Sequence, residues 1–317
     1  MTRYKVIVNP VSGRGTGAEA YPQIEKALGD LELDFEMCRT ESPGHAVELA
    51  EAASAAGFDA VVAAGGDGTA NEVLNGLTRA RREGSGNAAV GLISVGRGND
   101  FAYGVDTPPS LLDACRALAE DKRKLIDVGY SIGGDYPQGR YFGNGVGIGF
   151  DAVVGFEALK LKRLHGFPSY IVAALKTIFL YYQAPTVRVE YGDESLTQPA
   201  LMVSIMNGRR LGGGFMMAPE GKIDDGLFDL TIVDQVDRLS IFSLILRFTQ
   251  GSQFGHPAVK VIRASKISVT AVEGSLPAHA DGETLCEAGE SLVLENLPQA
   301  LEVIVPADGV GEEGFQT

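Results

Sequence analysis

The chain has 317 residues, of which 41 are acidic and 27 are basic, so its formal net charge is −14. This length predicts about two domains, and 45% hydrophobic with 21% charged residues is typical of a soluble globular protein. The acidity argues against nucleic acid as a partner and against firm attachment to an anionic membrane, but not against an anionic substrate held by main-chain amides.

The first 127 residues alternate short apolar runs with helical patterns. Strands are predicted at 5–8, 33–39, 59–64 and 89–94, and helices at 18–28, 43–57, 70–82 and 110–120. Ser42 and Pro43 are typical of an N-cap and a first helical residue. The strand at 59–64 is apolar after its first residue, as in a strand buried on both faces of a parallel sheet. Residues 1–127 are therefore predicted to form an α/β domain with a doubly wound parallel sheet.

After Asp127 the pattern becomes rich in glycine-spaced strands. Strands are predicted at 141–149, 186–191, 200–207, 227–233 and 266–270, and helices at 152–164, 169–182 and 238–248. We interpret residues 128–299 as a β-rich second domain with a few helices. A last strand at 300–306 could return to the first domain, and residues 307–317 are expected to form a flexible acidic tail.

The cysteines and the apolar segments bear on the cellular compartment. The chain has an odd number of cysteines, Cys38, Cys115 and Cys286, and no two of them form a CxxC pair. This argues against a disulfide framework and a zinc site. No secretory signal is visible, and no apolar stretch reaches the about 20 residues that span a bilayer. The sequence therefore predicts a cytoplasmic protein.

Three glycine-rich turns follow strands of the first domain: NPVSGRG at 9–15, GGDGTANE at 65–72 and GRGNDF at 96–101. The carboxyl ends of parallel strands share one edge of a sheet, so these turns are expected to lie together. Glycine lets the backbone approach a phosphate, and Ser12, Thr69 and Asn71 add donors. One such turn is usually only a tight turn, but three on one edge predict a phosphate site. Neither GxxxxGK[ST] nor GxGxxG is present.

Asp67 has two interpretations. A carboxylate between glycines at a strand end is badly placed against an unshielded phosphate, and it fits better where Mg²⁺ or its waters lie between them. Alternatively, Asp67 caps the helix that begins at Thr69.

At these residues the sequence resembles the diacylglycerol kinase catalytic family, in its soluble bacterial lipid-kinase branch, which is related to sphingosine and ceramide kinases. The resemblance covers nearly the whole chain and rests on NPxSG (9–13), GGDGTANEV (65–73), GNDFA (98–102), GGGFMMAP (212–219), DDGLFDL (224–230) and DGE (281–283). It implies a first domain like that of NAD kinase and phosphofructokinase and a β-sandwich-like second domain. It also implies an ATP-dependent lipid kinase that uses Mg²⁺ and phosphorylates a hydroxyl of a diacylglycerol-like lipid.

The resemblance also implies the site residues. Those at the nucleotide would be Asn9, Pro10, Val11, Ser12, Gly13, Thr40, Gly65, Gly66, Asp67, Gly68, Thr69, Ala70, Asn71, Arg97, Asn99, Asp100 and Asp127. Within this set, Asp67, Asp100 and Asp127 would organise water and Mg²⁺. A structural Mg²⁺ would bind the side chain of Asp225 and the main-chain carbonyls of Lys222 and Leu227, although an ordinary turn is the plainer interpretation of DDG without the family.

The DGE segment is the candidate for proton transfer. In an extended strand Asp281 and Glu283 would point to one face and one cleft. Phosphoryl transfer to an alcohol needs a base, and the family implies Glu283 for this role, with Asp281 as the alternative. Asp-Gly is also typical of a hairpin turn. His279 is expected to be structural or solvated rather than the base.

Arg97 departs from the family pattern. The loop before Asn99 usually reads Pro-x-Gly-Thr, whereas this chain has Ser94-Val95-Gly96-Arg97. Arg97 could pair with a phosphate oxygen, lie exposed or block the site.

Two segments are candidates for transient contact with the inner face of the membrane, from which a lipid substrate would come. The apolar segment Phe167–Tyr182 follows Lys160, Lys162 and Arg163 and could lie on a membrane or in the core. The segment Gly212–Met217 is the second candidate.

Two other functions stay open. One is a kinase of a soluble substrate, such as an NAD kinase, which also carries GGDGT, and the other is an inactive nucleotide- or lipid-binding regulator. The lipid and the oligomeric state, a homodimer included, are not predicted.

Overall fold

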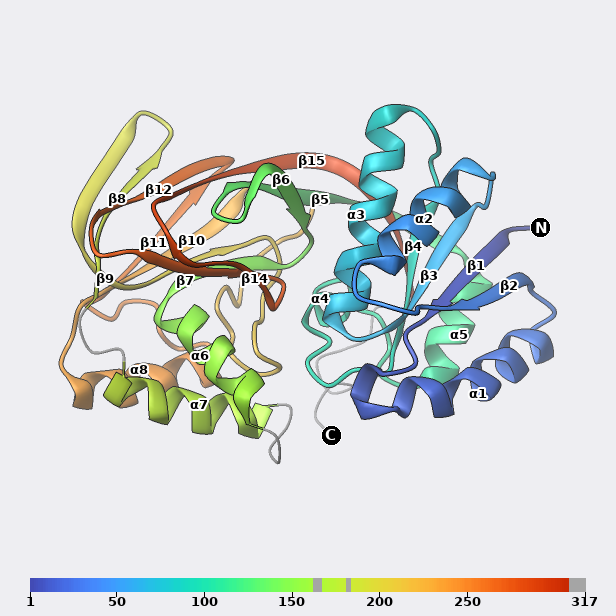
Figure 1. Cartoon of the computed structure of the whole chain (residues 1–317), viewed down its shortest axis with the longest axis horizontal. Coiled ribbons are helices and arrows are strands. Elements are labelled where there is room, and N and C mark those ends of the chain that lie inside the picture. Colours follow the sequence, from blue (N-terminus) through green and yellow to red (C-terminus); the bar gives the residue numbers. More distant parts are fainter. Residues whose placement is uncertain (162–166, 181–183, 308–317) are drawn as a thin grey trace. The chain divides into compact units, whose positions relative to one another are not determined.

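The computed structural model describes residues 1–161, 167–180 and 184–307 (Figure 1). The chain divides into two compact units. The first unit is Met1–Ile126 together with the chain from Gln299 onward, and the second unit is Asp127–Pro298. Two strands, β5 (Lys122–Gly133) and β15 (Ser291–Val305), carry the chain from the first unit into the second and back. Each unit has its own buried core and is described separately.

The first unit is a parallel sheet between two helical layers, so the predicted α/β fold is confirmed. Its strands lie in the order β2–β1–β3–β4, and β15 extends the sheet beside β4, where Val303 pairs with Val90. The strands are β1 (Arg3–Val8), β2 (Asp34–Arg39), β3 (Ala60–Gly65) and β4 (Ala89–Ser94). The helices are α1 (Thr16–Asp30), α2 (His45–Ala55), α3 (Asp67–Glu83), α4 (Asp100–Gly104) and α5 (Leu111–Glu120), with a 3-10 turn at Ser12–Arg14.

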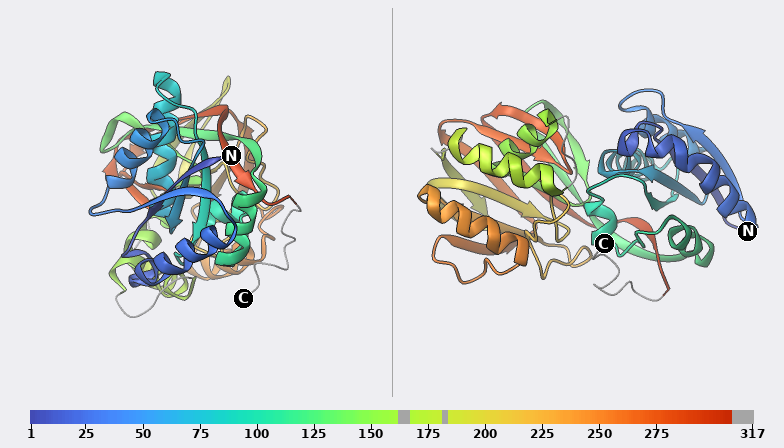
Figure 2. Two further views of the ribbon diagram at one scale, coloured as in Figure 1. Left: turned by 90° about the vertical axis from the view of Figure 1, so that its right-hand side faces the viewer. Right: turned by 90° about the horizontal axis from the view of Figure 1, so that it is seen from below.

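The helices of the first unit cover both faces of the sheet (Figures 1 and 2). Apolar residues of α1 and α5, among them Ile24 and Leu118, share one core with Val6, Val62 and Ile93 of the strands. Helices α2 and α3 pack on each other and on the opposite face. Every residue of β3 is buried, as expected for a central strand covered on both sides.

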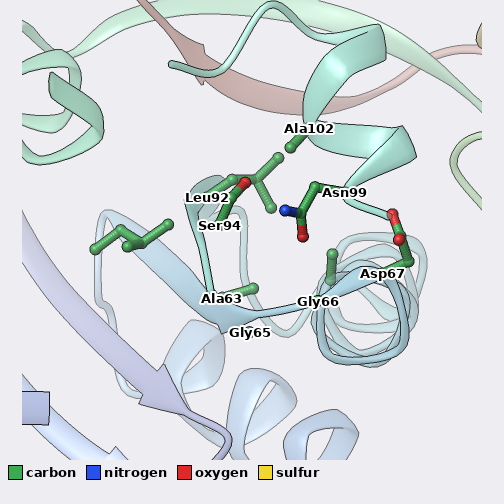
Figure 3. A pocket seen from close by; sticks show the side chains of 10 residues that line it. Ala63, Gly65, Gly66, Asp67, Leu92, Ser94, Asn99 and Ala102 are labelled. Carbon is green, nitrogen blue, oxygen red and sulfur yellow. The ribbon is translucent and has the colours of Figure 1, made fainter. Parts of the chain in front are cut away.

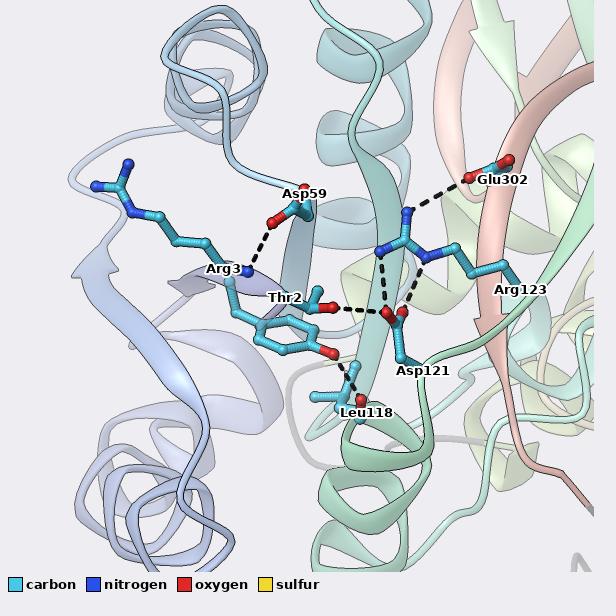
Figure 4. A network of polar contacts seen from close by, with 8 residues as sticks. Thr2, Arg3, Asp59, Leu118, Asp121, Arg123 and Glu302 are labelled. Atoms are coloured by element: carbon cyan, nitrogen blue, oxygen red, sulfur yellow. Dashed lines mark hydrogen bonds and ion pairs between the residues drawn. The ribbon is translucent and has the colours of Figure 1, made fainter.

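A polar network holds the start of the chain to the end of α5 (Figure 4). The hydroxyl of buried Tyr4 donates to the carbonyl of Leu118 at 2.6 Å, and burial raises the pKa of this phenol to about 12. The carboxylate of Asp121 accepts from the Thr2 hydroxyl at 2.7 Å and from Arg123 at 2.8 and 3.1 Å. The first strand, α5 and β5 are thereby joined at one point.

The second unit is β-rich and contains the predicted sandwich-like packing. Its remaining strands are β6 (Tyr136–Phe142), β7 (Gly145–Gly149), β8 (Thr186–Tyr191), β9 (Glu194–Met206), β10 (Phe228–Asp234), β11 (Val259–Ala264), β12 (Lys266–Glu273), β13 (Leu276–Ala280) and β14 (Glu283–Gly289). The long strand β9 belongs to two sheets, because its first half pairs with β8 and its second half pairs with β7 and β10. Phe142, Phe228 and Leu292 lie in the apolar core formed by these strands.

The described residues of the second unit also form three helices: α6 (Phe150–Lys160), α7 (Phe167–Leu180) and α8 (Arg238–Gln250). They enclose a separate apolar cluster with β9, which includes Ile178, Leu244 and Met202. The predicted helices at 152–164 and 169–182 run partly into residues 162–166 and 181–183, which lie outside the described residues. In the described part of the chain, no helix combines the length and hydrophobicity needed to cross a bilayer.

Candidate functional site

The three glycine-rich turns of the first unit meet at the carboxyl edge of its sheet. A Cβ on Gly96 would lie 2.3 Å from the Cα of Gly66, and a Cβ on Gly13 would lie 2.6 Å from the carbonyl oxygen of Val95. Gly13 also has a φ of 58°, which side-chain-bearing residues rarely adopt. The close packing of the turns therefore requires glycine, and the predicted juxtaposition is present.

Side-chain hydrogen bonds connect the first two turns. The amide of Asn9 donates to the hydroxyl of Thr69 at 2.9 Å, and its carbonyl oxygen accepts from the backbone N–H of Val11 at 3.1 Å. Thr40, at the end of β2, lies beside this turn because its backbone N–H donates to the carbonyl of Val8. Asn9 thus fixes the conformation of the first turn and its position beside the start of α3.

A small pocket opens between the second and third turns (Figure 3). Its empty volume is about 200 Å³, including the part open to solvent. It is lined by Ala63, Gly65, Gly66, Asp67, Ala70, Leu92, Ile93, Ser94, Asn99 and Ala102. The Asn99 amide donates to the carbonyl of Gly96 at 3.2 Å, which shapes the third turn. Polar groups therefore line the edge of this pocket, and apolar side chains line its floor.

Asp67 holds the start of a neighbouring helix. It is the first residue of α3, and its Oδ1 accepts from the backbone N–H groups of Asp100 at 2.6 Å and Phe101 at 3.2 Å, in the first turn of α4. The alternative prediction, that Asp67 caps a helix, is therefore confirmed, but the capped helix is α4 and not the helix predicted to begin at Thr69. A Cβ on Gly98 would lie 2.7 Å from Oδ2 of Asp67 and 3.6 Å from Oδ2 of Asp100. These two carboxylates therefore converge beside Gly98.

Arg97 is exposed and reaches from the third turn to the first. Its Nη2 donates to the carbonyl of Gly13 at 3.4 Å. The side chain is exposed, with its guanidinium at the rim of the turns, and its pairing with a phosphate oxygen stays a prediction.

Two residues of the GGDGTANE motif support helices. Asn71 is buried, and its side-chain oxygen accepts from the Asn75 amide at 3.2 Å. The Glu72 carboxylate accepts from the backbone N–H groups of Gly44 at 2.8 Å and Ala46 at 3.1 Å, at the start of α2. Helix α2 begins at His45 and not at Pro43, so the predicted Ser42 cap is wrong and Glu72 provides the capping carboxylate.

In the second unit, buried polar side chains connect several turns. The Asp127 carboxylate accepts from the backbone N–H of Gly226 at 2.6 Å, and its own N–H donates to the carbonyl of Ile223 at 2.7 Å. The Asn207 amide donates to the carbonyls of Asp127 at 2.9 Å and Gly143 at 2.8 Å. Asp127 therefore fixes the DDG segment within the second unit.

Asp281 and Gly282 form a two-residue hairpin turn, and Glu283 is the first residue of β14, so the segment is not one extended strand. Asp281 and Gly282 have φ values of 49° and 84° between β13 and β14. The prediction that both carboxylates face one cleft from an extended strand is therefore wrong. Asp281 is buried, and its carboxylate accepts from the backbone N–H groups of Gly143, Asn144 and Gly145 at 2.8 to 3.0 Å. Glu283 is exposed.

These three hydrogen bonds also explain why the predicted strand at 141–149 is two strands. The Asp281 carboxylate takes the N–H groups that would otherwise continue a ladder, so β6 ends at Phe142 and β7 begins at Gly145.

The predicted structural Mg²⁺ site at the DDG segment does not fit the arrangement of its residues. Oδ2 of Asp225 contacts the guanidinium of Arg263, and Oδ1 accepts from the backbone N–H of Leu227 at 3.2 Å. The same guanidinium lies 3.4 Å from the Asp229 carboxylate, and its hydrogen bond to Asp225 raises the pKa of Arg263. Arg263 thus supplies the positive charge that a metal ion would supply. Within the described residues, no three His, Cys, Asp or Glu side chains are placed to hold a metal ion.

The carboxylate of half-buried Asp151 and the buried imidazole of His279 flank Gly147 in the second unit. Oδ2 of Asp151 and Nε2 of His279 lie 2.3 and 2.5 Å from the position of a Cβ on Gly147. Asp151 Oδ2 and His279 Nδ1 are enclosed, and among the described residues neither has a hydrogen-bond partner. Burial raises the pKa of Asp151 to about 8 and lowers that of His279 to about 4. His279 is therefore buried and neutral, as a structural histidine, and not solvated.

Sequence reasoning missed Glu72 and Asn207 as organising residues, and it did not single out Asp151. The acid of a capping contact normally lies a few residues from its helix start, whereas Glu72 is 28 residues from Gly44. Asn207 follows β9, and a polar residue directly after an apolar strand was the signal that could have identified it.

Comparison with known protein families decides the relationship. Residues 3–131 match the diacylglycerol kinase catalytic domain, and residues 144–305 match the YegS C-terminal NAD kinase beta sandwich-like domain. The chain belongs to the diacylglycerol kinase catalytic family. The resemblance inferred from the motifs is confirmed, and the family is one of kinases.

Individual relatives agree with this membership. The chain is 28% identical to a diacylglycerol kinase of Staphylococcus saprophyticus over 98% of each chain, and 28% identical to one of Staphylococcus aureus over 98% of this chain and 95% of the relative. A Bacillus anthracis diacylglycerol kinase structure matches 97% of this chain and 98% of its own at 21% identity, with a TM-score of 0.72. An NAD kinase of Archaeoglobus fulgidus in complex with ATP matches 99% and 96% at 16% identity, with a TM-score of 0.51. The structural matches show that the fold is shared.

Proposed function

We propose that this diacylglycerol kinase family member transfers the γ-phosphoryl group of ATP to a hydroxyl of a diacylglycerol-like lipid. The observation that carries the proposal is the convergence of three glycine-rich turns at one edge of the parallel sheet, with Gly96 packed on Gly66. Glycine backbones packed this closely at the start of α3 are suited to bind a polyphosphate, because helix N-termini and closely spaced amides attract anions.

The first unit would bind the nucleotide. Asn9 and Thr69 hold the first turn against the second, and Arg97 at the rim can reach a phosphate oxygen with its guanidinium. ATP would enter as its Mg²⁺ complex, and Asp67 and Asp100, whose carboxylates converge beside Gly98, are the residues that would face the cation. Mg²⁺ neutralises charge on the phosphates when it is bound.

Glu283 is our candidate for the general base, and Asp281 for its support. The Asp281 carboxylate already accepts hydrogen bonds from three backbone N–H groups. Glu283, the first residue of β14, is exposed. In the reaction, the lipid oxygen forms a bond to the γ-phosphorus and the bond to the bridging oxygen of ADP breaks. The hydroxyl proton passes to the Glu283 carboxylate.

The test is transfer of labelled γ-phosphate from ATP with Mg²⁺ to diacylglycerol, monoacylglycerol, sphingosine and phosphatidylglycerol in mixed micelles, with NAD as a soluble acceptor. A labelled lipid supports the proposal. Label in NAD would assign the protein to the soluble-substrate class, and tight ATP binding without transfer to any lipid would assign it a regulatory role. Either result overturns the proposal.

The base is tested with Glu283→Gln, and Glu287→Gln, another exposed glutamate of β14, is the matched control. Glu283→Gln should lower kcat by about 100-fold or more and leave the dissociation constant for ATP unchanged. Equal turnover by the two variants would exclude Glu283 as the base.

A further inference from the structure

Arg263 connects two acidic residues at the start of β10. The DDG turn at 224–226 precedes β10, and β11 pairs with β10 in an antiparallel register that sets Arg263 directly opposite Asp229. Its Nη2 contacts Oδ2 of Asp225, and its Nε lies 3.4 Å from Oδ1 of Asp229. Opposite charges that face each other across antiparallel strands attract each other. The strand pairing therefore keeps one guanidinium in contact with both carboxylates.

This part of the chain carries more negative than positive charge. Residues 220–229 contain four acidic side chains and one lysine. The side chain of Asp225 is 24% exposed and that of Asp229 is 14% exposed, so water screens their mutual repulsion only in part. A guanidinium suits this place, because its planar group directs separate N–H donors at two acceptors. Arg263 thus brings to the turn a positive charge from another strand.

The donors of the chain already engage both oxygens of Asp225. Oδ1 accepts from the backbone N–H of Leu227 at 3.2 Å, and Oδ2 contacts Arg263. The adjacent N–H of Gly226 donates to the carboxylate of Asp127 at 2.6 Å, which closes the turn from the other side. A metal ion bound to the side chain of Asp225 would compete with the guanidinium for Oδ2 and would place two positive charges side by side.

We propose that Arg263 permanently replaces the structural cation that the family resemblance implies at the DDG turn, so that the second unit holds this turn without a metal ion. An arginine of the neighbouring strand is always present, whereas the occupancy of a metal site depends on the free ion concentration. One consequence rests on the proposed ATP-dependent function: Mg²⁺ is required as the partner of ATP, and free Mg²⁺ beyond that gives no further activation.

Metal binding by the wild type is measured first, because this needs neither a substrate nor a destabilised variant. Equilibrium dialysis with Mn²⁺ as the probe, without nucleotide, compares the wild type with Asp225→Asn. We expect the two proteins to bind equal amounts of Mn²⁺, since Asp225 is the partner of a guanidinium. Binding by the wild type that Asp225→Asn lacks would overturn the proposal.

Removal of the guanidinium should create a response to Mg²⁺. In EDTA, Arg263→Ala should melt about 2 °C below the wild type. Millimolar Mg²⁺ should recover part of this loss, because it binds the carboxylate oxygens left without a cation. Arg263→Lys keeps the charge and should respond less than Arg263→Ala. Lys260→Ala is the matched control, because Lys260 is another basic residue of β11 and donates to Gln198 at 2.6 Å. Equal Mg²⁺-induced shifts in the wild type and Arg263→Ala would contradict the proposal.

The enzymatic consequence has its own assay. With the ATP complex of Mg²⁺ held saturating, added free Mg²⁺ should leave the kcat of the wild type on diacylglycerol unchanged and raise that of Arg263→Ala. An equal rise in both proteins counts against the replacement of the cation by Arg263.

The two proposals fail in different ways. If no lipid is phosphorylated while dialysis and melting give the expected results, only the kinase function is rejected. If a lipid is phosphorylated and Mn²⁺ binding requires Asp225, only the role of Arg263 is rejected.

Discussion

At the scale of single residues, neighbouring carboxylates have different structural environments. The backbone of Asp281 has a left-handed conformation, and its buried carboxylate accepts hydrogen bonds from three backbone N–H groups. Glu283, two residues further along the chain, is exposed. A sequence pattern shows two acids in one motif but not which of them is already hydrogen-bonded. The hairpin preference of Asp-Gly was visible in the sequence, whereas the three N–H donors come from residues about 140 positions earlier.

We therefore expect Asp281 and Glu283 to differ in their effects on stability. Asp281→Ala leaves three buried N–H groups without an acceptor and should lower the free energy of unfolding by about 3 kcal/mol or more. Glu283→Gln should change it by less than about 0.5 kcal/mol. Urea unfolding of both variants measures the difference, and similar midpoints with similar slopes would show that Asp281 is not a structural support.

Asp151 should make stability depend on pH near neutrality. An unfolded aspartate titrates near pH ~3.9, whereas the pKa of folded Asp151 is about 8 because of burial. Between these values the folded state keeps a proton that the unfolded state has lost, so stability falls as pH rises. His279 has the opposite effect below pH ~6.5. Its folded pKa of about 4 lies below its unfolded value, so its contribution to stability rises with pH in this range.

Above that pH only the Asp151 contribution of this pair remains. The melting temperature of the wild type should fall between pH 6.5 and 8, and Asp151→Asn should remove part of this fall. The exposed Asp193→Asn is the control and should follow the wild type. Parallel pH profiles for all three proteins would mean that Asp151 is ionised at neutral pH.

At the scale of helices and strands, the sequence predicted the elements better than their ends. The strand at 89–94 and the strand at 186–191 match β4 and β8, because a fully apolar or alternating run is a local signal. The start of α2 was predicted wrongly, because its cap comes from Glu72 on α3. The five-residue α4 was missed, since its first turn is held by Asp67 from elsewhere in the chain. Tertiary contacts of this kind leave no local pattern.

The corrected cap can be tested by paired substitutions. Glu72→Gln weakens the charge-assisted bonds to Gly44 and Ala46 and should lower the free energy of unfolding by about 1 kcal/mol. Ser42→Ala should have almost no effect, because Ser42 does not cap α2. Chemical denaturation of both variants checks this, with the exposed Glu48→Gln as a control. A larger effect of Ser42→Ala would restore the cap predicted from the sequence.

At the scale of the whole molecule, the last described strand completes the first unit. Leu301, Val303 and Ile304 of β15 are buried, and Ile304 belongs to the same core as Val6 and Leu118. The strand also places Glu302 3.5 Å from Arg123, beside the network of Tyr4 and Asp121 in Figure 4. The first unit, to which we assign the nucleotide site, therefore depends on residues that the chain supplies only after the entire second unit.

This dependence predicts that a substitution near the end of the chain weakens nucleotide binding. Ile304→Ala removes buried methyl groups and should cost about 2 to 5 kcal/mol of stability in the first unit. Glu302→Gln, two residues away on the same strand and half-buried, should cost less than about 1 kcal/mol. Hydrogen exchange would locate the loss in β1, β3 and β4, and a fluorescent ATP analogue would report weaker binding at temperatures where the first unit of the variant is partly unfolded. If exchange rises only in the second unit, β15 belongs energetically to that unit, and the first unit folds without it.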